Sequence, residues 1–150
     1  MGTTFIKLGQ FLATRPDIIG DELSKELENL QDRLPPFSQD KAREIIKKDL
    51  GEQSFNSIIN LSEPVAAASI AQVHKAQIND GGTIKDVAIK ILRPDIKKIF
   101  NEEIDALMLF AFFVESFVKK TKRLKLVEVV FLLKEITNLE MDLRLSLIHI

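Results

Sequence analysis

The residues that most clearly suggest chemistry form the run Val87-Ala88-Ile89-Lys90. Successive side chains of a strand point to opposite faces, so Val87 and Ile89 would face a core while Lys90 projects from the other face. A lysine at the end of such a strand can pair with the phosphates of a nucleotide. An ordinary amphipathic strand with a lysine at its rim would have the same sequence, so this run alone leaves both interpretations open.

An alanine-rich segment precedes this strand at a spacing that suits one hairpin. Ala66, Ala68, Ala71 and Val73 fit the kinase loop pattern G-x-G-x-x-G-x-V, with every glycine replaced by alanine. Because alanine adopts positive φ less readily than glycine, and its methyl group holds phosphates farther from backbone amides, we expect a stiffer loop. Alanine-rich stretches are also common in packed turns, which is the alternative interpretation.

A third group of polar residues lies near the N-terminus. Lys7 and Gln10 are three residues apart on a predicted helix and therefore project together, while Gly9 lies toward the apolar side, where it permits close packing. A solvated polar helix face would have the same pattern.

Two carboxylates, Glu140 and Asp142, end the last predicted helix. Alternate helical positions point to nearly opposite sides, so these two would act as a pair only if the helix ends there. Glu140 is predicted to be the inward one, where its charge requires a cationic partner. The apolar residues in its row are Val129, Leu133 and Ile136. The alternative interpretation of Glu140 is a purely structural salt bridge at the helix end, which is compatible with a functional role.

Hydrophobic periodicity and chain breakers predict the elements that position these residues. The predicted helices cover residues 4–14, 21–33, 39–50 and 94–118, with a shorter piece at 55–60 and a last helix from about residue 127. The predicted sheet is a hairpin of residues 65–78 and 86–92 around a turn at 79–82. We expect Pro16 to stop the first helix, and Ser38 and Gly51 to cap the third.

The long helix at 94–118 carries an apolar stripe that we expect to pack against the sheet. The stripe consists of Ile96, Ile99, Phe100, Leu107, Phe110, Val114, Phe117 and Val118. Glu103 lies on the same helix, and ordinary kinases take the partner of the strand lysine from the first helix after that strand. One turn from the helix start, Glu103 can also tilt toward solvent and benefit from the N-terminal dipole.

Composition narrows the function classes. The 150-residue chain has a formal net charge of −1, so no global field recruits nucleic acid or an anionic membrane. Cysteine is absent, which excludes disulfides and cysteine-based sites, and two histidines alone make a poor metal site. The longest apolar run, residues 106–114, is too short to span a bilayer, and no secretory signal is apparent.

Taken together, the motifs resemble the UbiB family of atypical kinase-like ATPases in order and spacing, from about residue 4 to residue 145. They are Lys7-Leu8-Gly9-Gln10, Arg15-Pro16-Asp17, Ala66-Ala67-Ala68-Ser69, Val87-Ala88-Ile89-Lys90 and Glu140-Met141-Asp142. The resemblance implies an α+β fold, mostly helical by residue count, in which a protein-kinase-like N-lobe of a small antiparallel sheet plus helices follows a helical N-terminal extension. The implied segments are the extension at 1–61, the N-lobe at 62–145, and a tail at 146–150 that does not continue the family pattern.

The resemblance also assigns roles to residues. Lys90 would orient the phosphates of ATP, and Glu140, chosen over Glu103, would hold Lys90. The implied nucleotide-covering residues are Ala66, Ala67, Ala68 and Ser69, and the implied gating residues are Lys7 and Gln10. The cofactors would be ATP and Mg²⁺, with the metal ligands beyond this chain.

The resemblance finally implies a bacterial protein, cytoplasmic and peripheral to the inner membrane, that supports ubiquinone biosynthesis. Its partners besides ATP would be ubiquinone-biosynthesis proteins and lipid precursors, with no nucleic acid. Because the catalytic-loop and metal-binding residues would follow residue 150, we expect this chain alone to be inactive. A non-catalytic helical interaction or scaffold module is the alternative, and nucleotide binding separates the two.

Overall fold

The computed structural model describes residues 2–30, 34–142 and 148–149. The chain forms two compact units, which are described separately. A helical unit comprises Met1–Asp32 and Asp95–Asp142, and a sheet unit comprises Arg33–Pro94 and Leu143–Ile150. Helices predominate and the strands form one small antiparallel sheet, which confirms the predicted fold class. The predicted boundaries at residues 61 and 145 follow the family motifs and differ from the boundaries of these compact units, so they stay a prediction.

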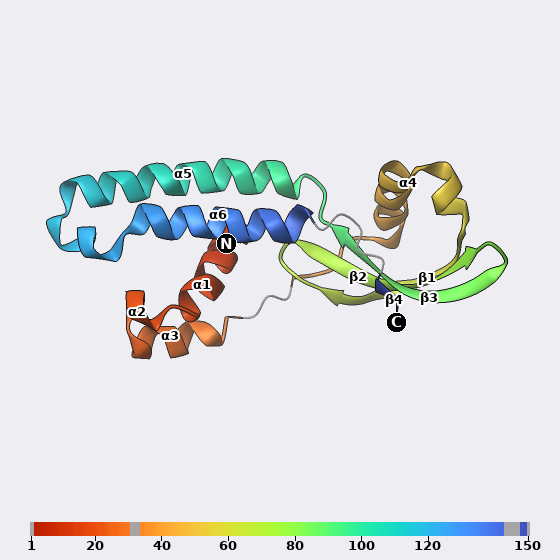
Figure 1. The fold of residues 1–150 in the computed structure, drawn as a ribbon, viewed down its shortest axis with the longest axis horizontal. Helices are drawn as coiled ribbons and strands as arrows, with labels where there is room; N and C mark the ends of the chain where they lie inside the picture. Colours follow the sequence, from red (N-terminus) through yellow and green to blue (C-terminus); the bar gives the residue numbers. More distant parts are fainter. Residues whose placement is uncertain (1, 31–33, 143–147, 150) are drawn as a thin grey trace. The chain divides into compact units, whose positions relative to one another are not determined.

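The helical unit consists of two long helices and a group of shorter ones. Its elements are α1 (Thr3–Ala13), α2 (Pro16–Ile19), α3 (Asp21–Glu28), α5 (Ile96–Phe117), the 3-10 helix η1 (Lys119–Leu124) and α6 (Leu126–Asp142). Helices α5 and α6 lie side by side and are joined by η1, as Figure 1 shows. Helix α1 contacts both α5 and α6, so it is held by the two long helices together.

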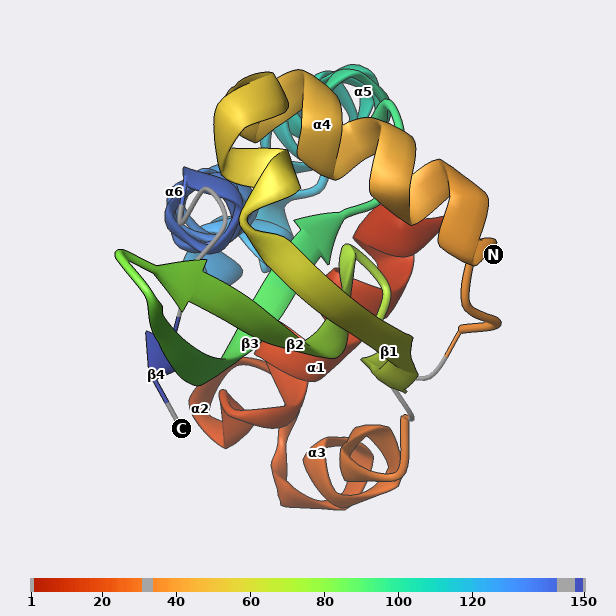
Figure 2. The same ribbon diagram turned by 90° about the vertical axis from the view of Figure 1, so that its right-hand side faces the viewer.

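The sheet unit combines one helix with a four-stranded sheet in the order β1-β2-β3-β4. Its elements are α4 (Gln39–Asn56), β1 (Ile58–Ala67), β2 (Ala71–Asp80), β3 (Thr83–Leu92) and β4 (Ile148–His149). Figure 2 shows α4 beside the sheet, leading into β1. At the predicted β2–β3 turn, Gly81 and Gly82 have φ of 60° and 95°, values that favour glycine. Of the predicted tail at 146–150, only residues 148–149 are described.

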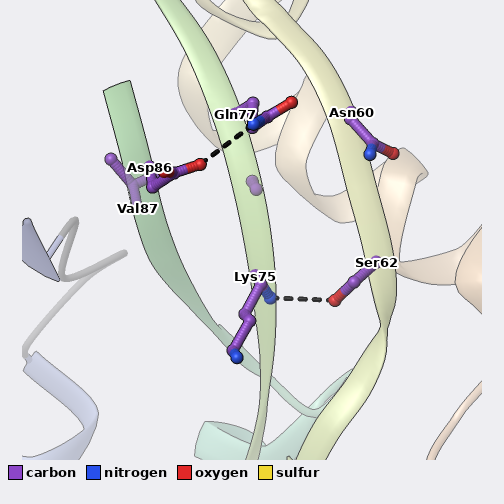
Figure 3. A pocket seen from close by; sticks show the side chains of 7 residues that line it. Asn60, Ser62, Lys75, Gln77, Asp86 and Val87 are labelled. Atoms are coloured by element: carbon purple, nitrogen blue, oxygen red, sulfur yellow. Dashed lines mark hydrogen bonds between the residues drawn. The ribbon is translucent and has the colours of Figure 1, made fainter. Parts of the chain in front are cut away.

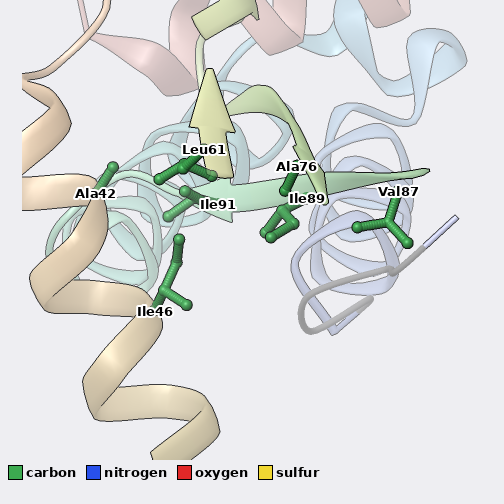
Figure 4. Packing of buried hydrophobic residues seen from close by; sticks show 7 residues of the cluster. All are labelled: Ala42, Ile46, Leu61, Ala76, Val87, Ile89 and Ile91. Atoms are coloured by element: carbon green, nitrogen blue, oxygen red, sulfur yellow. The ribbon is translucent and has the colours of Figure 1, made fainter. Parts of the chain in front are cut away.

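The core of the sheet unit lies between α4 and one face of the sheet. Its buried side chains are Ala42, Ile46, Leu61, Ala76, Val87, Ile89 and Ile91, shown in Figure 4. Val87, Ile89 and Ile91 alternate along β3 and are almost completely buried, which confirms the alternation predicted for this strand. The intervening residues of β3 must therefore point to the opposite face of the sheet.

The predicted helix boundaries are confirmed in part. The predicted end of the third helix at Gly51 is confirmed, because Gly51 has non-helical φ 80° and ψ 166° and separates that helix from a second helical segment, which runs to Asn56 within α4. The predicted cap at its other end is confirmed, since Ser38 accepts a hydrogen bond from the Lys41 amide. The first helix stops before Pro16, as predicted, since α1 ends at Ala13; Pro16 also begins α2, where a proline fits the first helical position. The helix predicted for 21–33 ends at Glu28, and residues 31–33 lie outside the described residues.

Strand β1 was missed in the sequence because its pattern is irregular. The pairing of β1 with β2 shifts register between Ile58 and Asn60, between Leu61 and Pro64, and between Pro64 and Ala66. Each shift interrupts the period of two from which a strand is recognised. The short piece predicted at 55–60 is therefore the end of α4 followed by the start of β1.

The apolar stripe predicted for α5 was right at Ile96 and Phe100 and wrong toward the C-terminal end of the helix. The buried residues are Ile96, Phe100, Ile104 and Ala111, whereas Phe110 is 64% exposed and Phe117 is 78% exposed. Helix α5 packs on α6 and α1 within the helical unit and does not belong to the unit that contains the sheet. Because the C-terminal half of α5 is apolar on nearly all sides, periodicity could not select the buried face.

In the part of the chain that the structure describes, no helix combines the length and hydrophobicity required to span a bilayer.

Candidate functional site

Lys90 lies on the face of the sheet opposite to the α4 core. The Cα atoms of Lys90 and Val73 are partners across β3 and β2, and those of Ala88 and Lys75 are the next pair on the same face. The register thus places Val73, Ala88 and Lys90 together on one surface. Two small aliphatic side chains beside a lysine can accept the flat apolar ring of a nucleobase and an adjacent phosphate.

The alanine-rich segment forms the turn between β1 and β2. Ala66 and Ala67 end β1, opposite Val73 and Gln72, and the amide of Ala68 donates to the Ala71 carbonyl at 2.8 Å. Among the described residues, the only non-glycine positions with positive φ are Asp95 and Lys125. The turn therefore uses backbone angles that alanine adopts without strain, as the prediction of a stiffer loop requires.

Arg93 ties this turn to the end of β3 and was missed in the sequence. Its amide donates to the Ile70 carbonyl at 2.9 Å, and its Nε donates to the Ala68 carbonyl at 3.0 Å. Its guanidinium also donates to the Pro35 carbonyl at 3.0 Å. Arg93 is a positioning residue for the alanine turn, and its place directly after β3 and before Pro94 is the signal that could have identified it.

A buried polar network supports the turn from the core side. Gln72 and His74 are completely buried, and the Gln72 amide exchanges hydrogen bonds of 3.0 and 3.2 Å with the backbone of Phe37. Gln72 Nε2 also lies 2.9 Å from His74 Nε2, while His74 Nδ1 lies 2.7 Å from the Ser62 carbonyl oxygen. Because an amide nitrogen only donates, His74 Nε2 must accept, and Nδ1 carries the proton that bonds Ser62. Polar residues on the apolar face of β2 were the available signal.

A hollow of about 350 Å³ lies on the sheet, nearer the β2–β3 turn than Lys90 is. Figure 3 shows the side chains that line it. Lys75, Gln77 and Asp86 line it and, by strand alternation, lie on the same face as Val73 and Lys90. Gln77 Nε2 donates to Asp86 Oδ1 at 3.0 Å, and the Lys75 amide donates to Ser62 Oγ at 2.9 Å. Sequence analysis missed this hollow, because it depends on strand register.

Within the described residues, no cluster of three or more histidine, cysteine, aspartate or glutamate side chains could hold a metal ion.

In the helical unit, Lys7 is joined to Glu140. Lys7 Nζ donates to Glu140 Oε2 at 2.8 Å, and the Lys7 side chain is 14% exposed against 40% for Glu140. Glu140 is half-buried and Asp142 is 76% exposed, so Glu140 is the more inward of the two carboxylates, as predicted, although the fully buried residues at this end of α6 are Thr137 and Met141. Glu140 lies at the rim of the buried face, where its carboxylate has the cationic partner that the sequence required. Lys90 belongs to the other unit, and its predicted pairing with Glu140 stays a prediction.

Gly9 and Gln10 continue the same motif along α1. Gly9 is buried, and a Cβ atom in its place would lie 3.2 Å from Leu30 Cδ1 and 3.9 Å from Leu27 Cδ2. The predicted close packing at Gly9 is thereby confirmed. Gln10 is half-buried on α1, and its predicted gating role stays a prediction.

Glu103 has a different role from the one expected. It accepts a hydrogen bond from the Thr4 amide at 3.3 Å and a short one from the Thr4 hydroxyl, so it holds the first turn of α1. A Cβ atom at Gly2 would overlap the Glu103 carboxylate. The expectation that Glu103 tilts toward solvent was wrong. Helix α1 is thus bound at its start by a carboxylate of α5 and farther along by a carboxylate of α6.

The Arg15-Pro16-Asp17 motif forms a local ion pair at the start of α2. Arg15 Nε and Nη2 donate to the two Asp17 carboxylate oxygens at 2.8 and 2.7 Å. This hydrogen bonding lowers the pKa of the Asp17 carboxyl and raises the pKa of the Arg15 guanidinium. The pair is exposed and lies between the end of α1 and the first turn of α2.

Comparison with known proteins adds a family match. The model of the ABC1 atypical kinase-like domain matches residues 29–146. A probable protein kinase UbiB of Marinobacter nauticus is 39% identical over 145 residues, which are 96% of this chain and 26% of that protein. One from Shewanella pealeana is 38% identical over 152 residues, covering 99% of this chain and 27% of that protein. One from Azotobacter vinelandii is 39% identical over 131 residues, covering 87% and 24%.

The chain therefore spans about a quarter of the length of the curated relatives that it matches. No solved structure matches it.

Proposed function

Because the chain belongs to the ABC1 atypical kinase-like family and matches part of the UbiB proteins, we propose that it forms the ATP-clamping part of an atypical kinase or ATPase that supports ubiquinone biosynthesis. The observation that carries the nucleotide part of the proposal is the register that gathers Val73, Ala88 and Lys90 on one face of the sheet, beside the alanine turn.

The residues of the sheet unit fit the parts of ATP. Val73 and Ala88 would contact the adenine ring, the Ala66–Ser69 turn would cover the phosphates, and Lys90 would orient the α- and β-phosphates. Bound ATP would supply the phosphoryl group, with Mg²⁺ neutralising its charge. Arg93 would act through the turn by keeping the Ala68 carbonyl fixed.

The helical unit would supply control rather than chemistry. Following the resemblance to UbiB-like proteins, we propose that Glu140 holds Lys90 and that Lys7 with Gln10 gates the cleft. The Lys7–Glu140 ion pair supports a link between these roles, because it connects the gating lysine to the same carboxylate. Removing Lys7 would then change the environment of Glu140 as well as the gate.

The resemblance also supports a place of action. We propose that the protein works at the cytoplasmic face of a bacterial inner membrane, with lipid precursors and ubiquinone-biosynthesis proteins as partners. The phosphoryl acceptor is left open in this proposal.

The nucleotide part can be tested by titrating the 150-residue chain with a fluorescent ATP analogue in the presence of Mg²⁺. We expect weak binding that Lys90→Ala reduces about tenfold or more, without turnover of ATP. Lys85→Ala is the matched control, since Lys85 lies on the same strand but pairs with Asp80 near the β2–β3 turn. Equal binding by Lys90→Ala and the wild type would favour the alternative of a non-catalytic helical module, and steady hydrolysis that depends on Lys90 would refute the view that chemistry requires residues beyond this chain.

A further inference from the structure

The C-terminal half of α5 presents apolar side chains to solvent on nearly all sides. Its exposed apolar residues are Leu109, Phe110, Phe112, Phe113, Phe117 and Val118. Between residues 109 and 118, all of which the structure describes, Ala111 alone is buried. Phe113 stacks on Phe117 at 6.1 Å and meets Phe112 edge-on at 6.4 Å between ring centroids. Neighbouring helix α6 adds exposed Phe131 to the same end of the hairpin.

A basic turn follows this apolar end directly. The cations of η1 and its C-cap are Lys119, Lys120, Lys122, Arg123 and Lys125. The sequence from 116 to 127 contains no acidic residue. Of the flanking acids, Glu115 accepts from the Val127 amide at 3.1 Å, whereas Glu128 is exposed and pairs with Lys125 at 3.2 Å, so it offsets the charge of that one lysine and leaves the four cations of η1. The turn therefore carries a strong local positive charge on a chain whose formal net charge is −1.

The distribution of these side chains around the helix determines what can cover them. Phe110, Phe113 and Phe117 share one side of α5, whereas Phe112 projects about 100° away from Phe113. A partner protein that packs on one side would leave the other ring in water. The acyl and headgroup region of a bilayer can surround such a helix end, and anionic headgroups complement the adjacent cations.

We propose that this end of the α5–α6 hairpin, residues 109–131, binds the surface of a bilayer that contains anionic phospholipid. The phenylalanine rings enter the boundary between headgroups and acyl chains, and the lysines of η1 contact the phosphates. This surface would be the part of the protein that contacts the membrane at which we propose that it acts. It involves no residue of the nucleotide site, so either proposal can fail without the other.

The test is co-sedimentation of the 150-residue chain with vesicles of phosphatidylcholine, with and without phosphatidylglycerol. We expect binding to the anionic vesicles that weakens as salt is raised, and much weaker binding to phosphatidylcholine alone. The double variants Phe113→Ser/Phe117→Ser and Lys119→Gln/Lys120→Gln should each reduce partitioning about tenfold or more. These side chains are exposed, so circular dichroism should show unchanged helix content.

Matched controls come from the sheet unit. Ile59→Ser/Ile84→Ser removes two apolar side chains that are 55% and 63% exposed, and Lys47→Gln/Lys48→Gln removes an adjacent lysine pair on α4. Both controls and Lys90→Ala should bind vesicles like the wild type. Absence of wild-type binding, or equal binding by the hairpin variants, would overturn the proposal. A change of oligomeric state in the phenylalanine variant with vesicle binding intact would instead identify a protein interface.

Discussion

The sheet unit and the helical unit position their lysines by different means. Lys90 takes its place from backbone register, because ten consecutive Cα pairs join β2 to β3 without a shift. Lys7 depends on individual side chains, since Glu140 holds its ammonium group and Glu103 holds the start of its helix. A residue positioned by strand pairing should tolerate changes at the protein surface, but it should be displaced when the core beneath the sheet is destabilised. A residue positioned by side-chain contacts can be affected by removing any one of those contacts.

The largest expected effect concerns the core beneath Lys90. Ile89→Ala leaves a cavity between α4 and the sheet, and it should lower the free energy of unfolding by about 2–5 kcal/mol. Thermal and urea denaturation measure this change, with Ile84→Ala at a 63% exposed position as the control. Similar losses for the two variants would show that β3 is not anchored through this core.

The buried amide of Gln72 should have the next largest effect. Gln72→Leu keeps the approximate size of the side chain but removes the partners of the Phe37 backbone and of His74, so we expect a loss of about 1–3 kcal/mol. Gln77→Leu, on the exposed face of the same strand, should cost much less. If Gln72→Leu and Gln77→Leu lower the free energy of unfolding equally, the buried network does not support the alanine turn.

Double-mutant cycles can separate the carboxylates of the helical unit. Lys7→Ala and Glu140→Ala should be non-additive in stability by about 0.5–1 kcal/mol, because Glu140 is 40% exposed and solvent screens the pair. If Glu140 also holds Lys90, that pair should couple by about 0.5–3 kcal/mol, while Lys90→Ala and Glu103→Ala should nearly add. Strong coupling of Lys90 with Glu103 would reverse the assignment.

The alanine turn should respond more weakly. Ala66→Gly or Ala68→Gly increases the freedom of a backbone that needs no positive φ, so each should cost about 0.5–1 kcal/mol and change the relative affinities for ATP and ADP. Isothermal titration of a full-length relative carrying the equivalent changes measures both affinities. Unchanged affinities in both variants would indicate that the turn does not touch nucleotide.

The smallest effect is expected from Asp17. Its pKa is lowered by the hydrogen bonds from Arg15, so the pair stabilises the fold above the unfolded-state pKa of about 3.9 and loses that contribution as pH falls through the lower folded-state pKa. Melting temperatures between about pH 6 and pH 2 should therefore decline slightly more steeply for the wild type than for Asp17→Asn. Parallel profiles would show that solvent screens this exposed pair completely.

Several features were predictable from the sequence because their causes are local. The alternation along β3, the turn at Gly81 and Gly82, and the Ser38 cap each depend on residues within a few positions of one another. The family motifs likewise identified the kinase-like fold before any contact was known. In each case the residue type restricts the backbone directly, so neighbouring residues suffice for the prediction.

Other features were decided only by tertiary structure. Lys7 and Glu140 are 133 positions apart, and no local pattern indicates that α1 would bring them together. Gln72 and His74 look like ordinary polar strand residues until the Phe37 backbone and the Ser62 carbonyl reach them. The C-terminal end of α5 is apolar on nearly all sides, so its sequence does not determine which side is buried. The packing of α6 and α1 against α5 determines the buried side, and the other sides stay exposed.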